Sequence, residues 1–355
     1  MQDLYGLATG IGSFPHKTAQ AALEIIFERL PEIPHWPQLP SAGVEEGFIR
    51  QSLKPLATSG LLRSDSGRSP YFLTDAPDWL DRLTDFYAQA LEAEAGNSLD
   101  SYAFTRSAAE GFYPFLEQVA RCDSAACYLK GQLAGPVTLG LQLTDVSLQP
   151  AFYRDDLREI LVTNLSLQLR WQVKMLAATG RPVIIFIDDP SILSFGQSSF
   201  VGLSREAIQG SLHTLADAAH QAGALVGVHA CAGVDWSLLF ELPFDIVNID
   251  VYHYFTSLLV YTASFRSYLE RGGCLAWGLV PTSAEVEQET ARSLLLRLEN
   301  NLETLGKKGI DPAVLARQLM FTPSCGTGTL SIGQAEKVYA LLQEISLRFR
   351  SGFAG

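Results

Sequence analysis

Residues 182 to 231 read PVIIFIDDPSILSFGQSSFVGLSREAIQGSLHTLADAAHQAGALVGVHAC. The stretch opens with a short β-branched apolar run (182 to 188), continues with an amphipathic segment ending in Gly (204 to 223), and closes with a second apolar run (224 to 230). Two such runs on either side of a helix-period segment are typical of a βαβ unit with parallel strands. The stretch therefore predicts an α/β fold.

The same alternation extends along the chain. Further candidate strands lie at 7 to 13, 35 to 41, 127 to 135, 245 to 250, 274 to 279 and 319 to 324. Further candidate helices lie at 19 to 30, 155 to 180, 283 to 306 and 331 to 350. Eight strands, mostly separated by helices, favour a single (β/α)8 TIM barrel over a doubly wound sheet. The run at 35 to 41, HWPQLPS, is the weakest strand of the eight.

The whole chain, residues 1 to 355, is expected to form this one barrel domain, because no linker, repeat or low-complexity tract divides it. The connection between about residues 42 and 125 is long for a single loop and contains SGLLRSDSGRSPYFLT (59 to 74). Such a Ser/Gly/Arg-rich stretch favours an inserted excursion or lid.

Composition limits the class of protein and its partners. The 26 Lys and Arg against 38 Asp and Glu give a formal net charge of −12, without a basic run to follow a phosphate backbone, so nucleic acid is not an expected partner. No apolar stretch approaches the roughly 20 residues that span a bilayer, so no membrane association is expected. Five scattered cysteines do not suggest a disulfide framework. A cytoplasmic protein is predicted.

Four residues at or just after expected strand ends suggest a metal site. His229 and Cys231 end one run, Asp250 ends the next, and Cys325 follows the last. Carboxyl ends of barrel strands meet at one mouth, and imidazole, thiolate and carboxylate groups suit Zn²⁺. The alternative is that the two cysteines are small buried residues and His229 a hydrogen-bonded core histidine. The remaining cysteines, Cys122, Cys127 and Cys274, are expected to be structural.

Five motifs occur in order along nearly the whole chain: IGSFP (11 to 15), LAGPVTL (133 to 139), IDDP (187 to 190), HAC (229 to 231) and CGTGT (325 to 329). The set resembles the C-terminal catalytic barrel of cobalamin-independent methionine synthase, within the wider group shared with uroporphyrinogen decarboxylase. The resemblance implies a zinc held by His229, Cys231 and Cys325, with Asp250 where the family usually has Glu. That zinc would activate a substrate thiol.

The resemblance also implies contacts to an amino-acid thiol such as homocysteine. Ile11, Gly12 and Ser13 match the substrate loop, with Ser13 donating to the substrate carboxylate, although a tight loop after the first strand is an equal alternative. Asp188 matches the residue that holds the substrate ammonium, and helix capping is the alternative for one of Asp188 and Asp189. Glu46, or Glu45 by a shift of one residue, matches a second acidic contact, and a solvated face is an equal alternative for this pair. Tyr252 and His253 either line the mouth or pack beside it.

The family's folate-packing Trp has no counterpart after GPVTL, where the chain continues GLQLTDVSLQ. This difference favours a methyl-corrinoid protein over folate as the methyl donor. The predicted function is a zinc-dependent thiol S-methyltransferase that converts homocysteine to methionine. Two alternatives stay open: a non-catalytic zinc-, thiol- or corrinoid-binding paralogue, and an enzyme like uroporphyrinogen decarboxylase.

Overall fold

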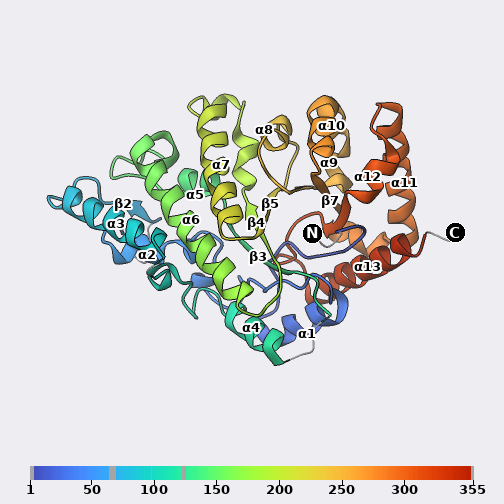
Figure 1. Ribbon diagram of the computed structural model, residues 1–355, viewed down its shortest axis with the longest axis horizontal. Coiled ribbons are helices and arrows are strands. Elements are labelled where there is room, and N and C mark those ends of the chain that lie inside the picture. The colour runs from blue at the N-terminus through green and yellow to red at the C-terminus, as the bar shows by residue number, and fades with distance from the viewer. Residues whose placement is uncertain (1–3, 64–68, 97, 122–124, 353–355) are drawn as a thin grey trace.

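A curled parallel sheet of six strands forms the centre of the molecule, seen here in a computed structural model that describes residues 4–63, 69–96, 98–121 and 125–352 (Figure 1). The strands are hydrogen-bonded in chain order, each parallel to the next. They are β3 (Leu129–Ala134), β4 (Val183–Asp188), β5 (Leu225–Ala230), β6 (Ile246–Ile249), β7 (Cys274–Val280) and β8 (Leu319–Pro323). The predicted α/β class is confirmed, and all six lie at runs expected to be strands.

The two remaining expected strands, 7 to 13 and 35 to 41, are not ladder strands in the described residues. The chain makes isolated parallel bridges there instead, pairing Ala8 with Phe321, Ser13 with Gln38, and His35 with Lys130. Pro37 and Pro40 lack a backbone N–H, so the 35 to 41 segment cannot continue a regular ladder. Six of the eight expected strands are thus regular ladder strands among the described residues, and the other two segments contact the sheet through these bridges.

Helices follow most strands and cover the outside of the sheet (Figure 1). The helices among the described residues are α1 (Ala19–Arg29), α2 (Lys54–Thr58), α3 (Trp79–Glu94), α4 (Phe112–Arg121), α5 (Pro136–Gln142), α6 (Asp155–Ala177), α7 (Arg205–Gln221), α8 (Ser237–Phe240), α9 (Val251–Leu258), α10 (Thr262–Glu270), α11 (Ala291–Lys307), α12 (Pro312–Arg317) and α13 (Ile332–Arg350). The five expected amphipathic helices correspond to α1, α6, α7, α11 and α13. Only the 283 to 306 segment begins late, because its first residues form a 3-10 turn, Ala284–Gln288.

Local signals account for where the longer helices begin and end. Ser204 accepts a hydrogen bond from the Ala207 N–H at the start of α7, and Thr290 and Ser331 form capping boxes at α11 and α13. Gly223 follows α7 with φ of +83°, a left-handed conformation that glycine adopts without a Cβ clash. The chain can therefore turn sharply into β5, which carries the candidate site.

The core has two parts that differ in position. Inside the curl lies a small cluster that includes Phe186 of β4, Ile246 of β6 and Met320 of β8. A much larger cluster lies between the outer face of the sheet and the helices. Every residue of β4 is buried, as expected for a parallel strand that is covered on both faces.

The 42 to 125 excursion has its own secondary structure. It contains α2, α3, α4 and an antiparallel pair, β1 (Leu62–Arg63) with β2 (Tyr71–Phe72). Residues 64–68, 97 and 122–124 of this segment, which include part of the expected lid stretch and Cys122, lie outside the described residues.

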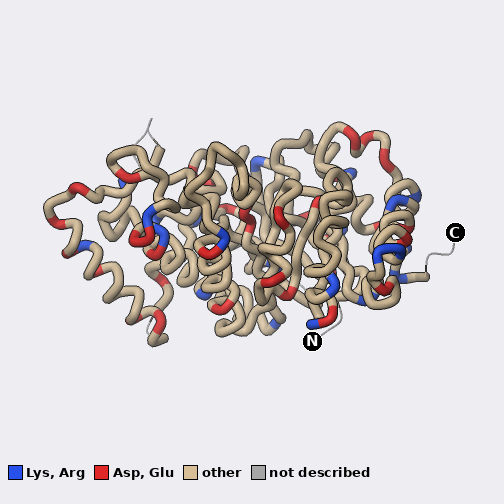
Figure 2. The backbone as a smooth tube through the Cα atoms, turned by 90° about the horizontal axis from the view of Figure 1, so that it is seen from above, with Lys and Arg blue, Asp and Glu red and all other residues tan. Residues whose placement is uncertain are grey.

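Acidic and basic residues are interspersed along the outer helices (Figure 2). Some form pairs one helical turn apart, such as Glu303 with Lys307 on α11 and Glu344 with Arg348 on α13, each at 2.7 Å. Among the described helices, none has the length and apolarity needed to cross a membrane.

Candidate metal centre

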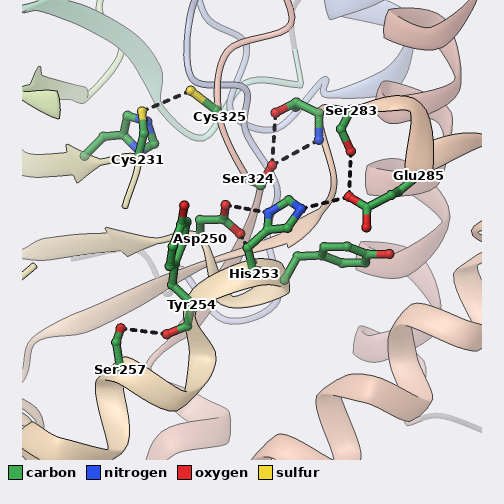
Figure 3. Close-up of polar contacts among 12 residues, drawn as sticks. Cys231, Asp250, His253, Tyr254, Ser257, Ser283, Glu285, Ser324 and Cys325 are labelled. Carbon is green, nitrogen blue, oxygen red and sulfur yellow. Dashed lines mark hydrogen bonds and ion pairs between the residues drawn. The ribbon is translucent and has the colours of Figure 1, made fainter. Parts of the chain in front are cut away.

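Three of the four predicted metal ligands meet at the carboxyl ends of the strands. His229 and Cys231 lie at the end of β5, and Cys325 follows β8. The Nε2 atom of His229 is 2.8 Å from the Cys231 sulfur. That sulfur lies 3.0 Å from the Cys325 sulfur (Figure 3). The three donor atoms lie within 4.8 Å of one another. Residues 94 positions apart in the sequence are thus brought into contact by the sheet.

The second nitrogen of His229 is held by Asn248, a residue that the sequence analysis missed. The Asn248 amide nitrogen donates to the Ala276 carbonyl at 2.9 Å and lies 2.5 Å from the Thr322 hydroxyl, so its oxygen faces His229 Nδ1. Nδ1–H then donates to that oxygen, and the Nε2 lone pair faces the two sulfurs. A polar Asn within the apolar run IVNI, in register with His229, was the available signal.

The donor set fits a soft cation. One imidazole nitrogen and two sulfurs direct lone pairs at the same small volume, where only protons or a cation can relieve the repulsion. The pKa of Cys325 is well below its usual range because the Cys231 thiol donates to it, while the same contact and burial raise the pKa of Cys231. Thiolate is the form of cysteine that ligates a metal, and a lowered pKa favours that form at Cys325.

A cavity of about 310 Å³ opens beside these three residues. Its lining combines a few polar groups with apolar side chains, as small-molecule sites generally do. The lining residues other than the three candidate ligands are Ile11, Ser13, Gln38, Pro40, Glu46, Phe48, Asp188, Pro190, Gly326, Gly328 and Thr329. The structure thus brings Ile11, Ser13, Glu46 and Asp188, predicted as substrate contacts, to one cavity with the candidate metal ligands.

Of the two neighbouring acids, Asp189 caps a helix and Asp188 faces the cavity, so each of the two interpretations holds for one residue. Asp189 accepts from the backbone N–H groups of Val137 at 3.0 Å and Thr138 at 2.8 Å, and so caps α5. Asp188 lines the cavity, and its buried Oδ1 atom has no hydrogen-bond partner among the described residues. Burial raises the pKa of Asp188 to about 6, an effect that the nearby Lys130 ammonium partly offsets. Asp188 is therefore the acid that is open to a ligand.

Ser13 is held by the CGTGT segment that carries Cys325. Its carbonyl accepts from Thr327 N–H at 3.0 Å, and its hydroxyl oxygen accepts from Gly328 N–H at 3.2 Å. A Cβ on Gly326 would lie 2.1 Å from that hydroxyl oxygen, so glycine is required for this close approach. The hydroxyl hydrogen of Ser13 is then available to a ligand in the cavity.

The adjoining loop residues support this position through their backbone. The Ile11 carbonyl accepts from the Lys130 ammonium at 2.5 Å, and the Gly12 carbonyl accepts from Gln38 N–H at 3.0 Å. Ile11 lines the cavity, whereas Gly12 is not among the lining residues. A Cβ on Gly12 would lie 2.9 Å from the Gln38 side chain, so this glycine permits close packing behind the loop.

Glu46 reaches the cavity but its carboxylate is already engaged. It accepts from the backbone N–H groups of Leu39 at 2.9 Å and of Glu110, and from the Gln51 amide at 3.3 Å. Burial raises its pKa, and these hydrogen bonds act in the opposite direction. Its neighbour Glu45 is exposed, so the ambiguity of one residue resolves to Glu46 as the cavity residue.

Asp250, the expected fourth ligand, is not part of the group of three. Its carboxylate instead accepts from the His253 N–H at 3.0 Å and lies 2.8 Å from His253 Nδ1. The described residues thus supply three ligands and not four. Of the cysteines expected to be structural, Cys274 is buried in the inner cluster and Cys127 is partly buried at its edge.

Fold and site together define an α/β protein with a candidate His-Cys-Cys metal centre beside a mainly apolar cavity that has a few polar groups in its lining. No protein-family model matches the chain, and no curated protein matches it. Function is therefore argued from the residues of the site.

Proposed function

We propose that this protein is a zinc-dependent methyltransferase that transfers a methyl group to a thiol, with homocysteine as acceptor and methionine as product. The observation that carries the proposal is the His229, Cys231 and Cys325 group, which opens onto a cavity lined by Asp188, whose Oδ1 atom has no hydrogen-bond partner among the described residues. Three protein ligands leave one tetrahedral position for a substrate, as in catalytic zinc sites. The resemblance in the motifs points the same way.

Two further segments that contact the sheet support an eight-stranded barrel in place of a six-stranded sheet. In a closed (β/α)8 barrel the first strand pairs with the last and the second with the third. The isolated bridges follow this order, joining Ala8 to Phe321, Ser13 to Gln38, and His35 to Lys130. We propose that these segments act as the first two strands of such a barrel, with the cavity at its carboxyl-terminal mouth.

Bound Zn²⁺ supplies one thing to the chemistry: it keeps the acceptor sulfur deprotonated near neutral pH, where a free thiol is mostly protonated. Asp188 binds the ammonium of the amino-acid thiol, and the Ser13 hydroxyl donates to its carboxylate. Both residues orient the sulfur for in-line attack, and such positioning contributes several kcal/mol to catalysis. Asn248 holds His229 by its second nitrogen throughout.

With a methyl-corrinoid protein as the methyl donor, the atoms and electrons of the transfer balance as follows. The acceptor thiol loses its proton to solvent, and the sulfur electron pair forms the new S–CH3 bond. The cobalt–carbon bond breaks and leaves its electron pair on cobalt, which passes from Co(III) to Co(I). Folate is not the proposed donor, because the cavity lining contains Phe48 but no Trp to pack against a pteridine ring.

The decarboxylase alternative gains no support from the cavity. Several arginines would be needed to bind the carboxylates of a porphyrinogen, and no Arg or Lys lines the described cavity. A non-catalytic zinc- or corrinoid-binding paralogue uses the same ligands, so only an assay of turnover separates it from the enzyme.

The test combines metal analysis with an activity assay. We expect about one zinc per wild-type chain, loss of that zinc in Cys325→Ser, and retention in Cys127→Ser, a matched cysteine outside the group. Methyl transfer from methylcobalamin to homocysteine should follow the zinc content. A Cys325→Ser protein that keeps its zinc would refute the ligand assignment, and stoichiometric zinc without methyl transfer would indicate the binding paralogue.

A further inference from the structure

His253 holds the Asp250 carboxylate by two contacts. Its backbone N–H donates to Oδ1 at 3.0 Å, and its ring Nδ1 lies 2.8 Å from Oδ2. On its far side, ring Nε2 lies 2.9 Å from a carboxylate oxygen of Glu285, which also accepts from the Ser283 hydroxyl at 2.8 Å. Figure 3 shows the Asp250 carboxylate turned toward the His253 ring.

Asp250 nevertheless lies beside the candidate metal ligands. It directly follows β6, the strand that pairs with β5, and only 5% of its surface is exposed. A Cβ on Gly278 would lie 3.1 Å from the Cα atoms of both Asp250 and Ser324, the residue that precedes Cys325. A carboxylate that could serve as a metal ligand is thus next to the group and directed away from it.

We infer that His253 is a positioning residue that keeps Asp250 off the metal, and so keeps the fourth coordination position open for the substrate sulfur; this inference rests on the proposed zinc-dependent function. A zinc site closed by four protein ligands is typically structural, whereas an open position is required for catalysis. The contact between Asp250 and His253 therefore determines whether this is a closed structural zinc site or an open catalytic one.

The physical basis is the cost of an unpaired buried carboxylate oxygen. Without the ring of His253, Oδ2 of Asp250 would lose its partner while remaining out of solvent. The nearest favourable partner would be the cation held by His229, Cys231 and Cys325. The backbone N–H of residue 253 would still cap through Oδ1, so α9 would keep its N-cap.

The experiment compares two substitutions of His253 in the full-length protein. His253→Phe keeps a ring but removes both nitrogen donors. His253→Asn keeps a side-chain N–H close to the position of Nδ1 and serves as the matched control. Zinc affinity is measured by competition with a chelator, and the ligand set is read from the visible spectrum of Co²⁺-substituted protein, which a purely structural role would not change.

We expect Asp250→Asn alone to leave zinc affinity within about threefold of wild type, because Asp250 is not a ligand and Asn is an equally good N-cap. His253→Phe should tighten zinc binding by about tenfold or more and shift the cobalt spectrum. Adding Asp250→Asn to His253→Phe should reverse both effects, and His253→Asn should resemble wild type.

Two results would overturn the inference while leaving the proposed function intact. One is a loss of about tenfold or more in zinc affinity on Asp250→Asn alone, which would make Asp250 a ligand. The other is a His253→Phe protein, folded by circular dichroism, with unchanged affinity and cobalt spectrum. A wild-type protein that binds no zinc would instead refute the proposed function, and the inference with it.

Discussion

Lys130 and Asp188 are ionisable residues buried inside the curled sheet, and both bear on the cavity. The Lys130 ammonium donates to the Ile11 carbonyl and to the Gln132 side chain at 3.1 Å, and lies 4.6 Å from the centre of the Phe186 ring. Burial lowers its pKa to about 8, and the Asp188 charge partly offsets this shift. Each charge thus helps the other to remain ionised. Lys130 supports the loop that contains Ile11, and Asp188 faces the cavity.

Replacing Asp188 tests its role toward the substrate ammonium. Asp188→Asn should weaken homocysteine binding to the zinc-loaded protein by about 10- to 100-fold, the range for losing a charge-assisted hydrogen bond. Zinc affinity should not change. Calorimetry with 4-mercaptobutyrate, which lacks the amino group, provides the control, because both proteins should bind it equally. Equal homocysteine affinity in the two proteins would remove Asp188 from the substrate site.

Lys130 predicts a specific pH dependence of stability. Its pKa of about 8 in the folded chain is below the unfolded value of about 10.4, so between these values only the unfolded chain holds the proton. Stability should therefore rise with pH in this window. The unfolding free energy of wild type relative to Lys130→Met should increase by about 2 kcal/mol from pH 7.5 to 9.5 in urea titrations.

Between pH 6 and 7 Lys130 carries its proton in both states of the wild-type chain, so Lys130 itself adds no pH dependence to the difference there. A difference that stays constant up to pH 9.5 would contradict the lowered pKa of Lys130.

Sequence motifs predicted the three residues that meet, His229, Cys231 and Cys325, because each lies at or just after a strand end. They did not predict that Asp250 would turn to His253, because that contact depends on side-chain direction at the start of α9. Nor did they find Asn248, whose role depends on its register beside His229. Residue type and spacing were enough to predict the three candidate ligands. The contacts of Asn248 and His253 could not be predicted because they depend on side-chain packing.

At the scale of elements, α5 depends on a residue from another strand. Its N-cap position is Gly135, which has no side chain to accept a hydrogen bond, and Asp189 after β4 supplies the acceptors instead. A Cβ on Gly135 would lie 2.3 Å from Asp189, so the glycine is needed for this approach. The connections after β3 and β4 are therefore joined at the edge of the sheet that carries the cavity.

Asp189→Asn should destabilise the protein by about 1 to 3 kcal/mol, because an amide nitrogen would replace one of two acceptor oxygens facing N–H donors. Urea denaturation measures this change. Asp311→Asn at the N-cap of α12, where one oxygen accepts from Ala313 N–H at 2.8 Å, is the matched control and should cost less. The zinc content should be unchanged. A loss of unfolding free energy equal to that of the Asp311→Asn control would argue against a special role for Asp189.

The strands that form a regular hydrogen-bonded ladder were predictable from the sequence, and the irregular segments were not. Largely apolar runs bounded by polar residues corresponded to β4 to β8, as expected for parallel strands that are covered on both faces, and the run of β3 was also found although it contains Lys130 and Gln132. The run at 35 to 41 failed as a regular strand because its prolines interrupt the ladder. The 42 to 125 excursion was expected as a departure from the barrel, but its helices and two-stranded sheet were not foreseen, because no periodic pattern was assigned there.

For the whole molecule, the candidate metal centre links β5 to the segment after β8, which are distant in sequence. A cation bound there should stabilise the folded chain by about 2.7 kcal/mol at a free concentration 100 times its dissociation constant. For 355 residues this corresponds to a rise in Tm of about 3 to 4 °C. Calorimetry with zinc should show this rise in wild type and Cys127→Ser but not in Cys325→Ser. An equal rise in all three would place the zinc elsewhere.

The bridges between the first segment and β8 also determine when the site can exist. The Thr9 N–H donates to the Phe321 carbonyl at 3.0 Å. Thr327 and Gly328 donate hydrogen bonds to Ser13, and all three of these donor–acceptor pairs join residues more than 300 positions apart. On the ribosome, β3 to β7 can pair as they emerge, but Ser13 must wait for almost the entire chain. A nascent or truncated polypeptide that ends before residue 325 therefore lacks Cys325 and the contacts of Ser13, so the proposed metal and substrate sites can form together only when the chain is nearly complete.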